Sequence, residues 1–313
     1  MTHMPRHMPD RLVIAPEDFT DVTYEVRDGV ATVMLARPEA RNGYTVRMGH
    51  ELASAMRLSD SDDDVRVVVL GAQGSDFCVG ADLSAGGFES VDGSGSGTGD
   101  APGLDDPEHP DFVEPAGRCT REMATMTTPV IAAVQGRAVG AGSTVILPAD
   151  IRVAAEDAKF GYVFTRRGIV AEGASSWWLP RIVGLPRATE WLVTGRVISA
   201  TEALEAGLVT RLVPVDDVLA TAREIAEEIA AATAPVAVAL TKRMLQEVSH
   251  AESPADAHAV DSAIIAHALT SPDAIEGVTS FFEKRTPSFP GKVSTDLPTG
   301  IPWPSERTRG HDS

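Results

Sequence analysis

The sequence predicts a mixed α/β core followed by an all-helical C-terminal region. Apolar runs typical of buried strands alternate with helical patterns over roughly the first two thirds of the 313-residue chain, and helical patterns alone follow. The hydrophobic fraction of 43% and the charged fraction of 23% are ordinary for a globular protein. No repeat is evident at the level of residues, so a repeat architecture is not expected.

The first part of the chain predicts a hairpin, a helix and a buried strand. Two runs of alternating apolar and polar residues, 22–26 and 30–35, flank an Asp-Gly pair, which is a hairpin pattern. A helix is expected to begin at Thr45, because apolar residues recur at helical spacing after it. The apolar run 65–70 between polar clusters indicates a fully buried strand.

The middle of the chain contains a change of composition. Residues 84–110 are rich in Gly, Ser, Asp and Pro, which predicts a mobile loop. A helical segment is expected over 112–126 and a second buried strand over 129–134. A helix over 141–147 and a strand over 151–154 complete this part.

Helices dominate after Ser175. We expect a short helix over 201–206, a strand over 208–213 and a long helix over 216–232. Proline is tolerated in a first helical turn, and three further helices are expected to begin at Pro235, Pro254 and Pro272. The domain organisation is therefore expected to comprise a flexible tail over 1–20, a core over 21–215, a helical region over 216–286 and a C-terminal tail over 287–313.

Charge, cysteine content and missing motifs exclude several classes. A formal charge of −18 argues against a general nucleic-acid binder. Two cysteines cannot form a disulfide framework or a Cys-rich metal site, and we assign no metal site. No signal peptide, membrane span, P-loop, zinc-helix motif or serine nucleophile elbow is visible. A reduced, cytoplasmic protein without a membrane partner is expected.

Two segments each join a buried strand to a turn of small residues. They read VVVLGAQGSDFCVGADL over 67–83 and PVIAAVQGRAVGAGS over 129–143. Small residues let a ligand approach the backbone closely. A helix beginning near Ala141 would direct free N–H groups and its positive dipole end at that ligand. Taken alone, either segment is equally compatible with tight packing.

Together these segments resemble the enoyl-CoA hydratase/isomerase (crotonase) family, whose patterns are approximately G-x-G-x-x-F-C-x-G-A-D-L and P-x-I-A-A-V-x-G-x-A-x-G-G-G. The resemblance covers about residues 20–287 in the expected order. It continues in five shorter segments, at 148–154, 159–161, 192–200, 206–209 and 281–285. It implies the family fold, a crotonase-like spiral of ββα turns followed by a helical trimerisation region, in a homotrimer or a dimer of trimers.

The resemblance also implies a ligand and its contacts. The substrate would be an acyl-coenzyme A thioester, with coenzyme A as part of the substrate and no prosthetic group. In the family, two backbone N–H groups form an oxyanion hole, and the matching residues here are Ala81 and Ala141, the second in place of a glycine. Each such donor is worth on the order of 3 kcal/mol to an enolate in a dry site. Residues implied to contact coenzyme A are Arg37, Ala40, Arg41, Gly80, Asp82, Leu83 and, from a neighbouring subunit, Phe281 and Lys284.

The chain departs from the family at the two glutamates that its hydratases use. The matching positions hold Thr144 and Phe164, and neither side chain exchanges protons as a carboxylate does. One carboxylate remains nearby, Glu172, where some dienoyl-CoA isomerases of the family carry an acid. We expect Glu172 to act as acid and base, with a pKa raised by an apolar cleft. The alternative is that it stabilises the N-terminus of a helix.

Neighbouring residues leave further alternatives. Arg166 or Arg167 would pair with Glu172 or with an acidic acyl tail, or both would be exposed to solvent. Trp177 and Trp178 would line an acyl pocket or pack in the core. The 84–110 loop falls where family members cover the acyl site, so it is expected to act as a lid. For Lys284, the alternative to ligand contact is charge compensation at a helix C-terminus.

Three functions are compatible with the sequence. The first is an acyl-CoA enzyme that shifts a double bond or performs a related enolate reaction, with Glu172 as acid and base. The second is an enoyl-CoA hydratase that combines Glu172 with a non-standard partner. The third is a non-catalytic acyl-CoA binder that has lost its acid/base pair. Asp150 is expected to hold a turn rather than to take part in chemistry.

Overall fold

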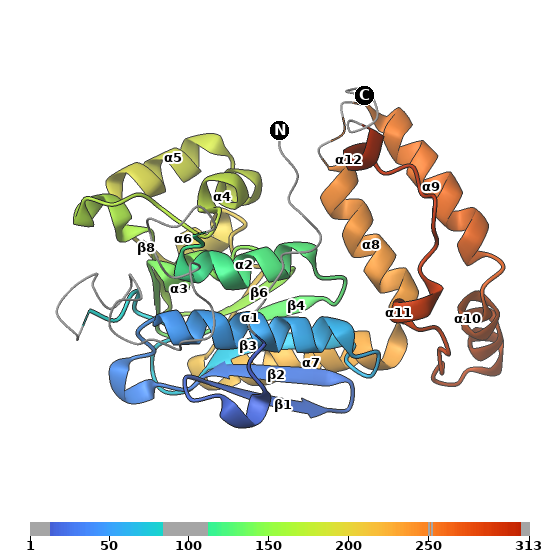
Figure 1. The fold of residues 1–313 in the computed structure, drawn as a ribbon, viewed down its shortest axis with the longest axis horizontal. Helices are drawn as coiled ribbons and strands as arrows, with labels where there is room; N and C mark the ends of the chain where they lie inside the picture. Colours follow the sequence, from blue (N-terminus) through green and yellow to red (C-terminus); the bar gives the residue numbers. More distant parts are fainter. Residues whose placement is uncertain (1–12, 84–111, 250, 252, 308–313) are drawn as a thin grey trace.

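The computed structural model describes residues 13–83, 112–249, 251 and 253–307. The expected 84–110 loop and most of the expected 1–20 tail lie outside the described residues. Strands and helices alternate in the first two thirds and helices alone follow, so the predicted mixed α/β core and helical C-terminal region are confirmed (Figure 1).

A six-stranded sheet forms the centre of the core. In spatial order its strands are β1 (Val22–Arg27), β2 (Val30–Leu35), β3 (Val67–Ala72), β4 (Val130–Val134), β6 (Ile151–Ala155) and β9 (Arg211–Val213). The hairpin β1–β2 is antiparallel, as predicted, and the remaining pairs are parallel. Parallel strands covered on both faces read as continuous apolar runs, and β3 and β4 are buried at every position.

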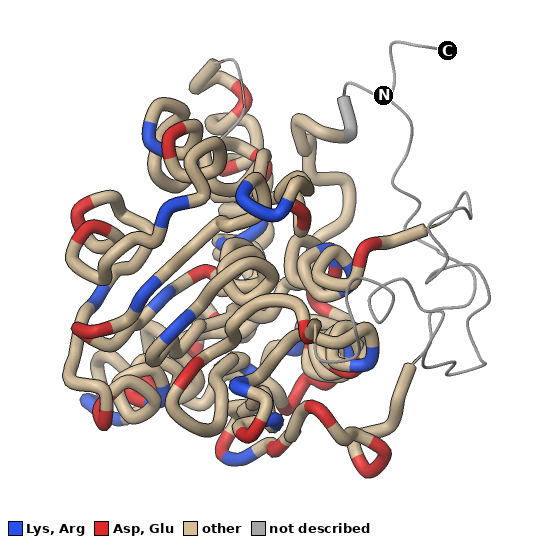
Figure 2. Tube along the Cα trace, turned by 90° about the vertical axis from the view of Figure 1, so that its left-hand side faces the viewer, with Lys and Arg blue, Asp and Glu red and all other residues tan. Residues whose placement is uncertain are grey.

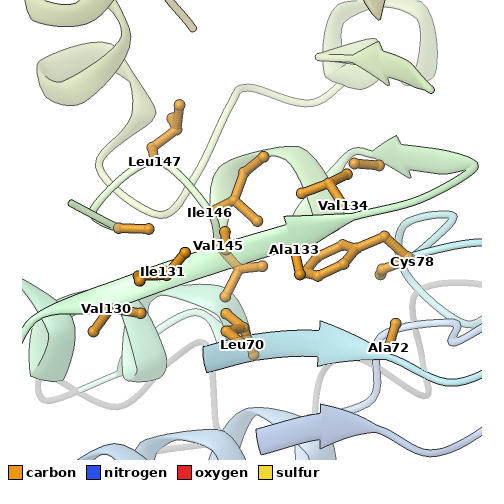
Figure 3. Packing of buried hydrophobic residues seen from close by; sticks show 14 of the residues in the cluster. Leu70, Ala72, Cys78, Val130, Ile131, Ala133, Val134, Val145, Ile146 and Leu147 are labelled. Carbon is orange, nitrogen blue, oxygen red and sulfur yellow. The ribbon is translucent and has the colours of Figure 1, made fainter. Parts of the chain in front are cut away.

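A smaller sheet lies beside the first. It contains β5 (Arg137–Val139), β7 (Lys159–Gly161) and β8 (Val197–Ser199). The segment after β4 therefore leaves one sheet and enters the other within three residues. Figure 3 shows Ile131 and Val134 of β4 packed together with Leu70 of β3 and with Val145 and Ile146, which follow the turn beyond β5.

Helices surround the sheets and then extend away from them. Around the core lie α1 (Val46–Ser61), α2 (Pro115–Thr125), α3 (Ala141–Thr144), α4 (Ser175–Val183), α5 (Leu185–Thr194), α6 (Ala200–Glu205) and α7 (Val218–Ala232). The C-terminal helices α8 (Pro235–Val248), α9 (Pro254–Ala268) and α10 (Pro272–Glu283) lie to one side of it (Figure 1). The Thr45 hydroxyl caps α1 by accepting from the Met48 N–H at 2.9 Å, as a predicted start at Thr45 requires.

Three predicted boundaries differ from the observed ones by three residues. The helix predicted over 112–126 begins only at Pro115, because the Glu114 side chain caps it there. The helix predicted over 141–147 ends at Thr144. The strand predicted over 208–213 begins at Arg211, because the N–H groups of Leu208 and Val209 both donate to the Ala203 carbonyl and continue the end of α6.

The segment that the sequence assigns to a C-terminal tail is partly packed. It contains α11 (Val293–Asp296) and α12 (Pro304–Arg307). Ile301 and Trp303 are buried against α8 and α9, and the Arg243 guanidinium lies 4.1 Å from the centre of the Trp303 ring. These contacts form a second, small hydrophobic core that covers one side of α8.

Asp150 fixes the start of β4 and joins α8 to the core. Its Oδ2 accepts from the Val130 N–H and from the Lys242 Nζ, each at 2.8 Å. Lys242 is buried and also donates to the Thr128 carbonyl at 2.9 Å. Asp150 therefore has a structural role, but its side chain joins a strand to a helix rather than holding the predicted turn.

We expect Asp150→Asn to lower the free energy of unfolding by about 1–3 kcal/mol, because a charge-assisted acceptor facing a buried ammonium group is weakened. Urea unfolding measures this effect, with the exposed Asp157→Asn as control. Equal unfolding free energies for the two variants would show that the ion pair contributes no net stability. Catalytic rates are expected to stay unchanged, since Asp150 does not line the cavity described below.

Candidate active site

The two glycine-rich turns lie against each other. Cys78 and Ala138 form a parallel bridge, and the Val139 N–H donates to the Cys78 carbonyl at 2.9 Å. Gly80 and Gly140 adopt φ angles of 99° and 56°, which favour glycine. A Cβ atom on Gly80 would lie 3.2 Å from the Val139 carbonyl oxygen, so the two backbones meet where only glycine fits easily.

Gly142 allows the first turn of α3 to approach the same point. A Cβ atom at this position would lie 2.4 Å from the Cys78 carbonyl oxygen, which is closer than real Cβ contacts. Ala141, immediately before it, is half-buried and carries its methyl group without such a conflict. The alanine at 141 and the glycine at 142 therefore follow from their different surroundings.

A cavity of about 430 Å³ opens beside these turns. Five predicted site residues line it together, namely Gly80, Ala81, Leu83, Ala141 and Glu172. Its walls are otherwise mainly apolar: Tyr44, Val79, Phe112, Pro115, Ala116, Val139, Gly140, Val163, Phe164 and Ile169, with Glu114 and Arg167 as the other charged residues.

The backbone amides of Ala81 and Ala141 donate to no protein acceptor in the described part of the chain. Tyr44 pairs with the residues on either side of Ala81. The Tyr44 N–H donates to the Gly80 carbonyl at 2.7 Å, and the Asp82 N–H donates to the Tyr44 carbonyl at 3.0 Å. Ala141 is the first residue of α3, where N–H groups have no partner within the helix. Both residues line the cavity, so both amides are available to a ligand.

Glu172 is half-buried, and its carboxyl group lies in the cavity wall. Its Oε1 accepts from the Thr144 hydroxyl at 2.6 Å, and its Oε2 is buried without a donor in the described part of the protein. The side chain does not cap α4, whose N-cap residue is Ala174 and which has no side-chain cap. The geometry therefore favours a role for this carboxyl in the cavity over helix capping.

A second carboxyl group, Glu114, lines the same cavity and is not predicted from the sequence. Its Oε1 accepts from the Gly173 N–H at 2.8 Å, and its Oε2 accepts from the Gly117 N–H at the start of α2. Glu114 is thus bonded to the residue that follows Glu172. An acidic residue directly before Pro115 was the available indication, but a helix start predicted at Phe112 places Glu114 inside the helix.

The surroundings of Glu172 favour its neutral form. Burial is the largest cause that raises its pKa well above the ordinary value, and the charge of the nearby Glu114 raises the pKa further. The hydrogen bond from Thr144 lowers the pKa and offsets part of this effect. Burial also raises the pKa of Tyr44 and brings that of Cys78 to about 12, so both remain neutral at neutral pH.

The remaining predicted neighbours have other partners. The Arg166 Nε donates to the Thr194 carbonyl at 2.8 Å, and Arg167 lines the cavity, but neither forms an ion pair with Glu172. Trp177 and Trp178 form an edge-to-face pair with ring centres 4.5 Å apart, and neither lines the cavity. An acyl pocket formed by the two tryptophans is therefore not supported.

The residues expected to contact coenzyme A in the first loop are ordered by ion pairs. The Arg37 guanidinium donates to Asp82 Oδ2 at 2.8 Å and to the Gly43 carbonyl at 2.7 Å. Arg41 donates to Asp76 Oδ2 at 2.8 Å and keeps about half of its side chain, 49%, exposed. Ala40 closes the short 3-10 helix η2 (Pro38–Ala40) between them. Arg37, Ala40, Arg41 and Asp82 lie outside the cavity lining.

Phe281 and Lys284 lie at the end of α10, away from the cavity of their own chain (Figure 1). The Phe281 side chain is exposed, and Lys284 ends the helix with a φ of 55°. Their expected contact with coenzyme A from a neighbouring subunit stays a prediction. Figure 2 shows acidic and basic residues interspersed along the described chain.

Neither a metal site nor a membrane-spanning helix is found among the described residues. Within the residues described, no group of three or more His, Cys, Asp and Glu side chains is arranged to hold a metal ion. None of the helices in the described ranges is both long enough and apolar enough to cross a membrane.

Comparison with known proteins gives consistent matches over most of the chain. The family described as enoyl-CoA hydratase/isomerase matches residues 25–292. The enoyl-CoA hydratase ACTT3 of Alternaria alternata is 37% identical over 275 residues, which are 88% of this chain and 87% of that protein. The 1,2-epoxyphenylacetyl-CoA isomerase of Escherichia coli (strain K12) is 34% identical over 274 residues, 85% of this chain and 97% of its own length.

A solved structure confirms the predicted fold. The probable enoyl-CoA hydratase/isomerase from Mycobacterium abscessus superposes with a TM-score of 0.73 and 34% sequence identity. The match covers 88% of this chain and 100% of that one.

Proposed function

Because the chain belongs to the enoyl-CoA hydratase/isomerase family and is an enzyme of that family, we propose that it shifts a double bond in an acyl-CoA thioester or performs a related enolate reaction. In this reaction Glu172 acts as acid and base. The observation that carries the proposal is one mainly apolar cavity lined by the Glu172 carboxyl and by two backbone amides that have no acceptor in the described part of the chain. Such a cavity can accept a proton from a substrate and stabilise the charge that the proton leaves behind.

The reaction moves one proton and creates no net charge. The ionised Glu172 takes a proton from the α-carbon of a 3-enoyl thioester, and the electrons of that C–H bond form an enolate. The thioester oxygen of the enolate accepts hydrogen bonds from the Ala81 and Ala141 amides. Glu172 then returns the proton to the γ-carbon, and the double bond becomes conjugated with the thioester.

Hydration is the second candidate, and a specific observation favours it. Thr144 and Phe164 occupy the positions of the two family glutamates, yet the cavity holds two carboxyl groups at other positions, Glu172 and Glu114. A pair of carboxyl groups can activate water and protonate the α-carbon. The Alternaria relatives are named as hydratases and the Escherichia coli relative as an isomerase, so names alone do not separate the two reactions.

An absorbance assay separates these reactions. We expect the absorbance of the enoyl-thioester band to rise when the enzyme is given 3-enoyl-CoA thioesters of different chain length, because the product is conjugated. Given 2-enoyl-CoA thioesters, a hydratase would instead lower this absorbance. Loss of the band with 2-enoyl substrates and no change with 3-enoyl substrates would replace isomerisation by hydration.

We predict that Thr144→Val shifts the pH profile without removing the catalytic group. The Thr144 hydroxyl donates to Glu172 and lowers its pKa, so its loss raises that pKa further. Because Glu172 acts as a base when ionised, the acid limb of the kcat/KM profile moves to higher pH. Thr144→Ser is the matched control, since it keeps the hydroxyl. An unchanged acid limb in Thr144→Val would remove Glu172 as the group that the profile reports.

Substrate binding, assembly and location are further parts of the proposal. Arg37 and Arg41 supply cations near the cavity, and Phe281 with Lys284 would reach coenzyme A from the neighbouring subunit of a homotrimer or a dimer of trimers. Exposed apolar side chains support such an assembly; on α8 to α10 they are Leu245, Ile265, Leu269, Ile275, Val278, Phe281 and Phe282. A cytoplasmic location is supported by two cysteines that are both free.

A further inference from the structure

We propose that Glu114 and Glu172 share one proton and act as a single acid/base pair, in which Glu114 is the positioning residue. This inference rests on the proposed function, since it concerns the carboxyl group that performs the proton transfer. It gives a role to Glu114, which caps α2, whereas Glu172 lies in the segment before α4. Neither residue stands at the positions of Thr144 and Phe164.

The two carboxyl groups are held independently on the same cavity wall. Glu114 is fixed by the N–H groups of Gly173 and Gly117, and Glu172 is fixed by the Thr144 hydroxyl. The bond to Gly173 ties Glu114 to the backbone directly after Glu172. Both side chains line the cavity, so the pair faces the place where a substrate binds.

A buried carboxyl oxygen without a hydrogen-bond donor supports the presence of the shared proton. Glu172 Oε2 is buried and has no donor among the described residues, although a buried polar atom without a partner costs about 1–3 kcal/mol. The Glu114 carboxyl lies on the same cavity wall and is bonded to the residue after Glu172, and one carboxyl group can donate to another only when it is protonated. A single shared proton therefore supplies the missing donor.

Electrostatics also favour one proton on the pair. Two adjacent carboxylates in an apolar site repel each other, so they do not ionise together at neutral pH. The other titratable groups that face Glu172 are Tyr44 and Cys78, both neutral, and the one cation in the described cavity lining is Arg167, which forms no ion pair with it. The surroundings do not provide the charge that full ionisation of both groups would need.

A shared proton makes the pair both a base and an acid in the resting enzyme. The ionised carboxyl group of the pair takes the α-proton of the substrate, while the first proton stays on the other carboxyl group. Both carboxyl groups are then protonated. One proton leaves to the γ-carbon as the enolate collapses, and the pair again holds one. Proton and charge balance are complete without any other group.

The test compares Glu114→Gln with wild type in two measurements. Infrared spectroscopy of the free enzyme at neutral pH should show the band of a protonated carboxyl group in wild type. This band should be lost in Glu172→Gln and should shift in frequency in Glu114→Gln, where burial still favours a protonated Glu172 but the proton is no longer shared. In Glu114→Gln, kcat should fall at least about 10-fold, and the acid limb of the kcat/KM profile should move to lower pH. The direction follows because the charge of Glu114 raises the pKa of Glu172.

Controls separate a shared proton from helix capping. Glutamine at 114 keeps an oxygen that can accept from a backbone N–H, and thermal unfolding measures any loss of the cap. Glu114→Asp keeps the carboxyl and should retain the infrared band, and the exposed Glu205→Gln on α6 should match wild type in every measurement. The double variant Glu114→Gln/Glu172→Gln should be no slower than Glu172→Gln alone, because the two groups act as a unit.

The outcomes distinguish this inference from the proposed function. Absence of the carboxyl band in wild type, or a Glu114→Gln enzyme with wild-type kcat and acid limb beside an inactive Glu172→Gln enzyme, overturns the shared proton and leaves the proposed function intact. Full activity of Glu172→Gln overturns the proposed function. Should Glu114→Gln fail to fold, the frequency of the wild-type band decides, because a carboxyl group that donates its proton to a second carboxyl absorbs at lower frequency than one without a partner.

Discussion

Glu172→Gln is expected to lower kcat by about 10²- to 10⁴-fold, the usual contribution of a general acid or base. The substitution is nearly isosteric, and its side-chain oxygen can still accept from the Thr144 hydroxyl. KM should change little, because the cavity walls that contact the substrate stay as they are. Steady-state kinetics on the best 3-enoyl-CoA substrate measures the effect, with the exposed Glu156→Gln as control.

The same variant is expected to be at least as stable as wild type at neutral pH. The raised pKa of Glu172 means that the folded protein holds its proton more tightly than the unfolded chain does. Its contribution to stability is therefore present below the unfolded pKa and is lost as pH rises towards the raised folded pKa. Glutamine never ionises and avoids this loss. A fully active Glu172→Gln enzyme would contradict the catalytic assignment, and an unfolded one would contradict the expected stability.

Ala141→Pro is expected to lower kcat by about 10²- to 10³-fold, because it deletes one of the two proposed amide donors to the enolate oxygen. Proline is tolerated at the first position of a helix, and Ala141 occupies this position in α3. The Ala141 amide has no acceptor among the described residues, so its removal breaks no internal hydrogen bond there. The loss should therefore be seen in turnover more than in folding.

Ala141→Gly is the matched control for this experiment. It keeps the amide and restores the residue that the family pattern carries at this position, so kcat should stay near that of wild type. Thermal unfolding of both variants identifies any misfolding. Wild-type turnover by a folded Ala141→Pro enzyme would remove the 141 amide from the mechanism.

Local chemistry explains which parts of the fold the sequence could predict. Asp28 and Gly29 both have positive φ angles, of 52° and 77°, as a tight hairpin turn requires, and their dipeptide is a known pattern for this turn. The prolines at 235, 254 and 272 each stand in the first turn of a helix. The apolar runs of β3 and β4 follow from burial on both faces.

Other parts depend on contacts that no local pattern reports. Strands β5, β7 and β8 have three residues each, which is too short for an alternating pattern. Ile301 and Trp303 stand in a Pro-rich segment without periodicity, and their burial depends on the partner surface of α8 and α9. Such elements are defined by tertiary packing, which a single sequence read locally cannot supply.

The candidate site also contains residues that the sequence could predict and one residue that it could not. Gly80, Ala81, Ala141 and Glu172 lie within or near recognisable segments, and the structure brings all four to one cavity. Glu114 is 59 positions from Gly173, its hydrogen-bond partner, and its place on the cavity wall follows from the packing of α2. A long-range contact of this kind has no sequence pattern, which is why the second carboxyl group was missed.

The contact between the Gly80 and Gly140 turns has a consequence for how such a site can change. The groups proposed to bind the thioester oxygen belong to the main chain, and their positions are set by glycines and by the bridge between Cys78 and Ala138. Replacement of side chains elsewhere in the wall leaves them in place. The two proposed amide donors therefore do not depend on which wall positions carry a carboxyl group, here Glu114 and Glu172 and not Thr144 or Phe164.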